Sequence, residues 1–225
     1  MKKNLSLLIV FLLIQISGIN ANASETPSYE ELMNVTLSKL NNSTTPDRYT
    51  TCIAELKRIS AIYPEEWLTY YYVSLYEIQY TFNNLSINND NLLNDALANI
   101  ELLKQNKKAD VSEVSTIEGY YYYAKIASNP SKNGQLYYKN VLDAYHKALK
   151  YNPKNPRAQL LFLMFRLNMA GFTGSKQEEN IYEQLTQIEK LFESENSNTL
   201  NPSWGKNISI AMKKKFETKD SSIHN

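Results

Sequence analysis

The chain contains few of the residues that form turns between strands, and few of those that most often carry out catalysis. Its 225 residues include six glycines, seven prolines, two histidines and one cysteine. No glycine-rich hairpin signal and no sustained alternation of apolar and polar residues occurs, so strands are not expected. The single cysteine, Cys52, cannot form an intrachain disulfide, and the fold must be held by its core alone. Cys52 lies on an apolar helical stripe, which predicts a small buried hydrophobe.

A strong net charge is also absent. The chain has 24 Lys and Arg residues against 23 Asp and Glu residues. Such a balance gives no electrostatic reason to bind nucleic acid or an anionic membrane surface. We therefore predict no nucleic-acid partner.

Only one long apolar run occurs, at the start of the chain. It extends from Leu5 to Ile19, after Lys2 and Lys3 and before Ala21-Asn22-Ala23. A basic start, a short apolar run and a small-x-small end are typical of a secretory signal peptide. The run is shorter than the roughly 20 apolar residues of a membrane span, so an uncleaved anchor is the weaker interpretation.

This pattern sets the expected organisation of the chain. We expect residues 1–23 to be a removed signal peptide, residues 24–217 to form the folded domain, and residues 218–225 to be a disordered tail. The protein is then exported, to the periplasm or outside the cell, with no membrane span once the signal is removed.

Motifs that carry chemistry are missing as well. The two histidines are His146 and His224, and no cluster of His, Cys or carboxylates has the spacing of metal ligands. No nucleophile has a base suggested beside it, and no phosphate-binding or dinucleotide-binding motif occurs. We predict a protein that is not an enzyme, with no catalytic residues, no metal site and no cofactor.

Helical periodicity is abundant, and it comes in two kinds. The first kind has one apolar and one polar face, and it covers residues 48–63, 92–103, 137–148 and 181–192. The second kind is apolar nearly all round, and it covers residues 67–82, 112–128 and 158–170. Because the two kinds alternate, we expect an inner row of sandwiched helices covered by amphipathic ones. The predicted fold is an all-α, helix-hairpin solenoid of about nine helices.

Details of the predicted helices follow from single residues. Four tyrosines, Tyr120–Tyr123, suit a sandwiched helix because the ring packs while the hydroxyl can still reach a polar partner. Ser74 and Gly119 are small enough to allow inner helices to approach closely. Ser112 and Ser115 are both candidate capping residues for the four-tyrosine helix. Asn201-Pro202 is expected to open the last helix, with Trp204 on its apolar side.

One segment resembles a known repeat family. In "AYHKALKYNPKNPRA", the residues Ala144, Tyr145, Ala148, Leu149 and Pro153 stand where the tetratricopeptide repeat places small, aromatic, small, aliphatic and proline residues. With "YPEEWLTYYY" and "NPSWG", the chain is similar to short exported tetratricopeptide-like proteins of Gram-negative bacteria. The resemblance implies a non-catalytic scaffold that binds a protein or peptide partner. The segment "SNPSKNG", residues 128–134, is interpreted as an insertion between the two helices of this repeat.

Tyrosines on the inner helices raise an alternative function. Tyr72, Tyr76 and Tyr80 form a stripe turned away from the stripe of Trp67 on the same predicted helix. They either pack against a second neighbour or line a binding groove, together with Tyr122 and Tyr123. The groove interpretation predicts a protein that binds a glycan or a small ligand, because solenoids bind partners on their concave surface.

Overall fold

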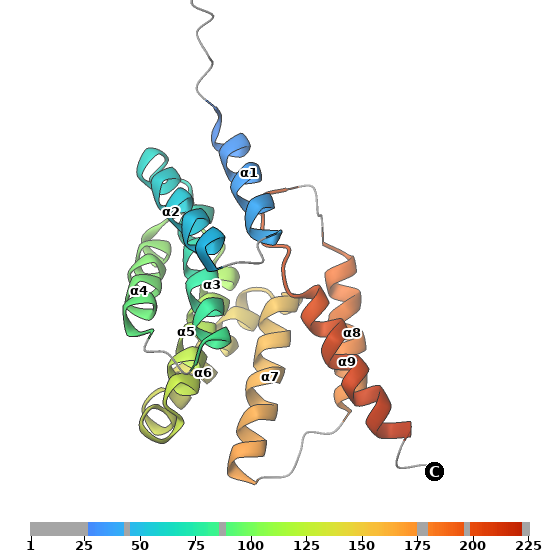
Figure 1. Ribbon diagram of the computed structural model, residues 1–225. Coiled ribbons are helices and arrows are strands. Elements are labelled where there is room, and N and C mark those ends of the chain that lie inside the picture. Colours follow the sequence, from blue (N-terminus) through green and yellow to red (C-terminus); the bar gives the residue numbers. More distant parts are fainter. Residues whose placement is uncertain (1–26, 43–45, 86–88, 175–179, 196–198, 222–225) are drawn as a thin grey trace, which may run out of the picture.

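The computed structural model describes residues 27–42, 46–85, 89–174, 180–195 and 199–221 (Figure 1), and these form nine helices without strands. The all-α prediction is therefore confirmed. The helices are α1 (Tyr29–Asn41), α2 (Pro46–Ile62), α3 (Trp67–Asn83), α4 (Asp90–Gln105), α5 (Val111–Ser128), α6 (Pro130–Tyr151), α7 (Pro156–Thr173), α8 (Ile181–Glu193) and α9 (Lys206–Ser221).

The two ends of the chain are described only in part. The predicted signal peptide, residues 1–23, lies outside the described residues. At the other end α9 continues to Ser221, into the segment predicted as a tail, and residues 222–225 again lie outside the description.

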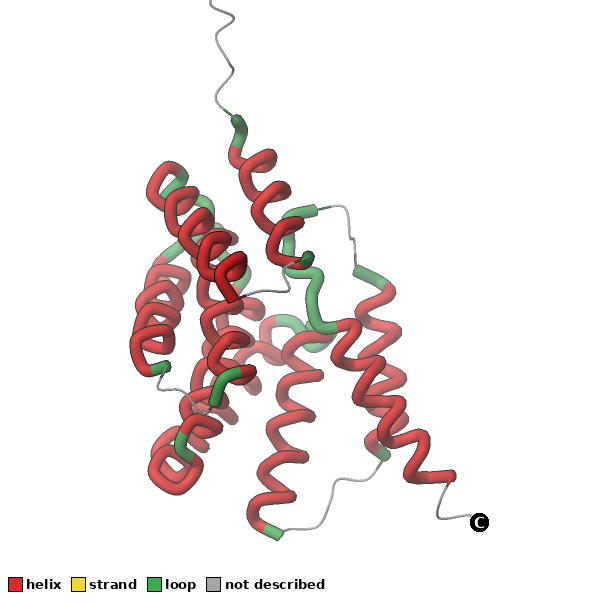
Figure 2. Tube along the Cα trace, viewed as in Figure 1, coloured by secondary structure: helices red, strands yellow, loops and turns green. Residues whose placement is uncertain are grey.

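The helices form the expected layers. α3, α5 and α7 are buried on most of their circumference, whereas α2, α4, α6 and α8 each bury one face. Figure 2, in the view of Figure 1, shows α2 and α4 beside α3 and the last pair, α8 and α9, at the opposite end of the array. A helix that is apolar all round needs neighbours on several sides, and this arrangement provides them.

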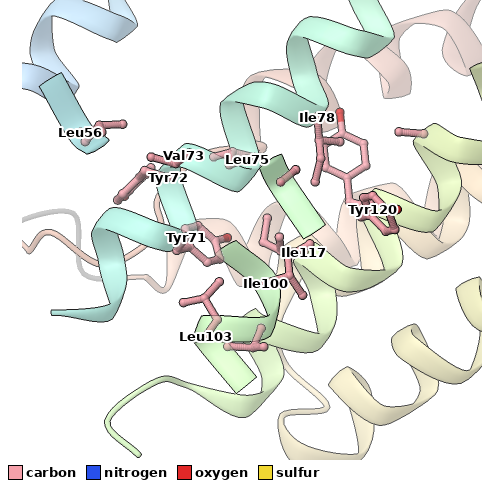
Figure 3. Close-up of a cluster of buried hydrophobic side chains, with 14 of the residues drawn as sticks. Leu56, Tyr71, Tyr72, Val73, Leu75, Ile78, Ile100, Leu103, Ile117 and Tyr120 are labelled. Carbon is pink, nitrogen blue, oxygen red and sulfur yellow. The ribbon is translucent and has the colours of Figure 1, made fainter. Parts of the chain in front are cut away.

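The core centres on the contact between α3, α4 and α5. Tyr71, Leu75 and Ile78 project from α3 toward Ile100 of α4 and Ile117 of α5 (Figure 3). All five side chains are at most 1% exposed. Burying such side chains removes roughly 1.5–3 kcal/mol of unfavourable hydration each, so this contact sets much of the stability.

Three helix starts differ from the sequence predictions. The cap of α5 is Asp110, whose side chain accepts from the backbone N–H of Glu113, and Ser115 is buried one turn further along. α6 begins at Pro130 behind its cap Asn129, so most of the segment read as an insertion extends this helix. α9 begins at Lys206, which leaves Trp204 in the preceding loop.

The two small residues contact outer helices, not inner ones. A Cβ atom on Gly119 would lie 2.7 Å from the ring of Tyr145 on α6. Ser74 donates to the carbonyl oxygens of Tyr70, in its own helix, and of Ala96 on α4. The close approach is therefore within the hairpins α3–α4 and α5–α6.

In the part of the chain that is described, every helix is too short or too polar to cross a membrane.

Candidate functional site

The five candidate tyrosines do not share one groove. Tyr72 and Tyr76 line a cleft beside α1, Tyr80 lines a cavity beside α2, and Tyr123 lines a cavity beside α7. Tyr122 stacks on Tyr137 of α6, with ring centroids 5.7 Å apart. Packing and lining are thus combined in Tyr72, Tyr76, Tyr80 and Tyr123, whereas Tyr122 lines none of these cavities.

Two adjoining cavities follow the surface of the inner helices. The first has a volume of about 450 Å³ and lies between α3, α5, α6 and α7. The second, about 560 Å³, lies between α7 and α9. Met164 and Asn168 of α7 line both cavities, which therefore adjoin, and we call the two together the inner groove. Volumes of this size are typical of sites for small organic ligands.

Aromatic rings form the floor of the inner groove. The ring of Phe82 stacks on Tyr120 at 5.0 Å and meets Tyr123 edge-on at 5.0 Å. Tyr123 in turn meets the ring of Phe165 edge-on at 5.3 Å. At the rim Phe172 is 66% exposed, although its side chain is large and apolar. A flat apolar ligand in this groove would pack against this aromatic cluster and remove Phe172 from water.

Polar groups in the inner groove are few. The hydroxyl group of Tyr123 is hydrogen-bonded to the side-chain amide of Asn168, and burial raises the pKa of this tyrosine. The far end, beside α9, carries the positive charge of Lys215 and the amide of Asn207. The thioethers of Met164, Met169 and Met212 add soft, polarizable contacts along the wall. The groove thus suits an apolar body with a negatively charged or polar edge.

A separate cleft of about 780 Å³ lies between α1, α3 and the loop before α9. Its lining is mostly amide and hydroxyl side chains, including Asn34 and Asn41 of α1 and Asn207 of α9, with Tyr76 and Trp204 as aromatic surfaces. We call it the polar cleft. Amides that can both donate and accept, beside aromatic rings, match the surface of a sugar.

A buried polar network lies below these surfaces, and sequence analysis missed it. Arg157 at the start of α7 donates to Glu113 of α5 at 2.9–3.1 Å, and it also donates to Glu195 beyond α8. Burial by itself would lower the pKa of Arg157, but the charge of Glu113 and the hydrogen bonds to Glu195 and Glu113 together outweigh burial and raise that pKa. Tyr71 donates to Glu113 at 2.8 Å and accepts from the indole N–H of Trp204 at 2.9 Å.

The signal for this network was present in the sequence. Glu113 and Arg157 are charges inside or beside helices that are otherwise apolar all round, and a buried charge requires a partner. The network fastens the loop before α9 to the centre of the array. Within the described residues, no group of three or more His, Cys, Asp or Glu side chains could hold a metal ion.

Comparison with known proteins supports the fold. No protein-family model matches the chain, and no curated protein matches it. The solved structure of the HusA haemophore from Porphyromonas gingivalis is similar, with a TM-score of 0.73 over 84% of this chain and 92% of that chain. The two sequences are 24% identical over the match. The two chains therefore share an all-helical fold.

Proposed function

We propose that this protein binds a large, planar, apolar molecule of the tetrapyrrole class, such as haem, in the inner groove. The observation that carries the proposal is the aromatic cluster of Phe82, Tyr120 and Tyr123, which lines the same cavity as the exposed ring of Phe172. The similarity of the whole fold to a haemophore supports the choice of ligand. Haem would be the cargo of the protein and not a resident cofactor.

The chemistry of the groove matches the parts of such a ligand. A porphyrin disc is apolar on both faces and stacks on aromatic rings, as it could between the floor and Phe172. Its carboxylate side chains would extend toward Lys215, where a positive charge lies at the open end of the groove. The methionine sulfurs and the Tyr123 oxygen are the groups in the groove that could approach an iron atom.

Titration of the purified protein with haemin, followed by visible absorbance, tests this proposal. We expect saturable binding that weakens about tenfold in Phe172→Ala, since the variant loses apolar surface that the ligand would cover. Tyr151→Ala is the matched control, because Tyr151 is 62% exposed and lies outside the groove. Equal affinity in both variants, or no saturation at all, would overturn the proposal.

The polar cleft favours a second candidate function, which is the binding of a glycan. The partly exposed ring of Tyr76 lies beside the amide of Asn41, with its hydroxyl group 3.4 Å from Oδ1 of Asn41. A glycan array read with Tyr76→Ala as the comparison would test it, and loss of all hits in the variant is the expected result. A protein-binding scaffold remains a third proposal, and affinity capture that recovers no protein partner would count against it.

Three further proposals concern the whole chain. The helix pairs α3–α4 and α5–α6 support an origin in tetratricopeptide-like repeats. The pattern of residues 1–23 supports export. The proposal that the chain is not an enzyme rests on the missing sequence motifs.

A further inference from the structure

A third cavity lies on the outer side of the array, away from the inner groove. It has a volume of about 430 Å³, and α2, α3 and α4 all contribute to its wall. We call it the outer cavity. Its lining is mainly apolar or aromatic but includes one carboxylate. The lining includes Tyr49, Ile53, Lys57, Glu77, Tyr80 and Leu92.

The carboxylate of Glu77 is the unusual feature of the outer cavity. Glu77 is 1% exposed, and neither of its carboxylate oxygens receives a hydrogen bond. Nζ of Lys57 lies 2.8 Å from Oε1, which makes an ion pair but lacks the geometry of a hydrogen bond. The second oxygen, Oε2, is buried and has no hydrogen-bond partner. A buried charge without hydrogen bonds is costly, so this oxygen has unused capacity for a donor.

The charges around Glu77 do not balance. Lys57 is shared, because its Nζ also lies 2.9 Å from Asp95 of α4. The groups that face Glu77 are therefore Lys57 and Tyr49 from α2, Tyr80 from its own helix and Asp95 from α4. With Glu77 ionised, one cation faces two carboxylates. Burial raises the pKa of Glu77 to about 7, and attraction by Lys57 only partly offsets it.

Aromatic rings line the outer cavity next to this carboxylate. The rings of Tyr49 and Tyr80 lie 5.3 Å apart at an angle of 31°. The hydroxyl group of Tyr49 is buried and has no hydrogen-bond partner. Electron-rich ring faces beside a carboxylate attract organic cations, and the apolar walls at Ile53 and Leu92 suit an alkyl chain.

We propose that the outer cavity binds a primary ammonium group carried on a short alkyl chain. The ammonium donates to the free carboxylate oxygen of Glu77 and to the hydroxyl oxygen of Tyr49, while the alkyl chain lies along Ile53 and Leu92. One added positive charge brings the group of Glu77, Lys57 and Asp95 to neutrality. The proposal is independent of tetrapyrrole binding, because the two cavities share no lining residue.

The test uses n-butylammonium as the ligand and n-butanol as its neutral counterpart. Protein NMR titration at pH 8, where Glu77 is ionised, should show saturable shifts at the outer cavity for the amine. In Glu77→Gln we expect affinity to fall at least tenfold. Glu55→Gln is the matched control, because Glu55 also forms an ion pair with a lysine, Lys39, but it lies on α2 and does not line the cavity.

A second measurement keeps the proposal falsifiable if the variant refolds differently. The side-chain carboxyl carbon of Glu77 in the unaltered protein should titrate at a lower pH when butylammonium is saturating, since the cation favours the ionised form. An unchanged midpoint would overturn the proposal. Equal binding of n-butanol would also overturn it, because that result identifies a merely apolar cavity.

Discussion

At the scale of single residues, Arg157 shows how this fold accommodates buried charge. Its guanidinium is buried between Glu113 and Glu195, and each nitrogen that carries hydrogen faces a carboxylate. Desolvating three charges is expensive, and the cost is offset only while every partner remains. The group therefore adds specificity to the arrangement of α5, α7 and the end of α8.

Replacing Arg157 by Met should destabilise the protein by about 3–5 kcal/mol, because Glu113 is left buried without its cation. Urea denaturation followed by circular dichroism measures the change. The control is Lys139→Met, since Lys139 pairs with Asp143 on the surface and both side chains are more than half exposed. We expect the control to change the free energy of unfolding by less than about 0.5 kcal/mol. Equal small changes in both variants would show that the buried network contributes little.

Glu77 predicts an unusual dependence of stability on pH. Its pKa is about 7 in the folded protein against 4.5 for an unperturbed side chain, so the folded state binds more protons between these values. Stability due to Glu77 is thus fully present below about pH 4.5 and is lost as the pH rises through 7, by on the order of 3 kcal/mol.

The measurement is the free energy of unfolding of Glu77→Gln minus that of the unaltered protein, from pH 4.5 to 8. Taking the difference cancels the titration of all other carboxylates that both proteins share. We expect the difference to rise with pH in favour of the variant. A flat difference would mean that the pKa of Glu77 is unperturbed.

At the scale of helices, periodicity predicted where each element lies but not where it begins. The alternation of amphipathic and fully apolar segments identified the core of α2 to α8, because burial on one or several sides directly shapes the sequence. The start of a helix depends on a single capping hydrogen bond, and several residues near the start could have formed that bond. Asp110 caps α5 although Ser115 also fits a capping pattern, and Trp204 lies outside α9 because that helix starts late.

Candidate sites were harder to predict for the same reason. Helical spacing puts Tyr72, Tyr76 and Tyr80 on one side of α3, but the neighbouring helix changes along its length. Both Tyr76 and Tyr80 contact the ring of Tyr49 on α2, but Tyr76 lines the cleft beside α1 and the loop before α9, whereas Tyr80 lines the cavity beside α2. Which cavity a side chain enters depends on the crossing of helices distant in sequence, and the spacing within one helix carries no information about it.

The hairpin of α5 and α6 depends on the absence of a side chain at Gly119. An added Cβ atom would lie 2.7–2.9 Å from three ring atoms of Tyr145, whose side chain is fully buried. Gly119→Ala should therefore destabilise the protein by about 1–3 kcal/mol, since the two helices must separate. Thermal denaturation will detect this as a lower melting temperature.

Gly171→Ala is the control for this substitution. Gly171 also lies within a helix, α7, but an added Cβ atom would meet nothing within 4 Å. Alanine favours a helix over glycine by up to about 1 kcal/mol, so the control should be slightly more stable. A stabilised Gly119→Ala variant would contradict the close contact between α5 and α6.

At the scale of the whole molecule, the last hairpin is tied to the middle of the chain. In a simple solenoid each unit contacts only its neighbours, and the ends unfold first. Here the ring of Trp204 stacks on Tyr120 of α5 with centroids 6.1 Å apart, and its N–H donates to Tyr71 of α3. Tyr72 also donates to the carbonyl oxygen of Leu200 at 3.0 Å. These contacts couple α8 and α9 to the core formed by α3 and α5.

Trp204→Ala should uncouple the last hairpin from the rest. Losing the ring stack and the indole hydrogen bond is expected to cost about 2–4 kcal/mol of stability. This loss weakens the packing of α8 and α9 against the rest of the array. Native-state hydrogen exchange can locate it, because regions that open separately exchange at lower free energy than the global core. In the unaltered protein, α8 should exchange together with α3 and α5. In the variant, α8 should exchange faster while α3 and α5 keep most of their protection.

Tyr151→Ala, which removes an exposed aromatic residue, should leave both groups unchanged. A uniform loss of protection across all helices of the variant would instead show that Trp204 is an ordinary core residue, and that the array unfolds as one unit without it.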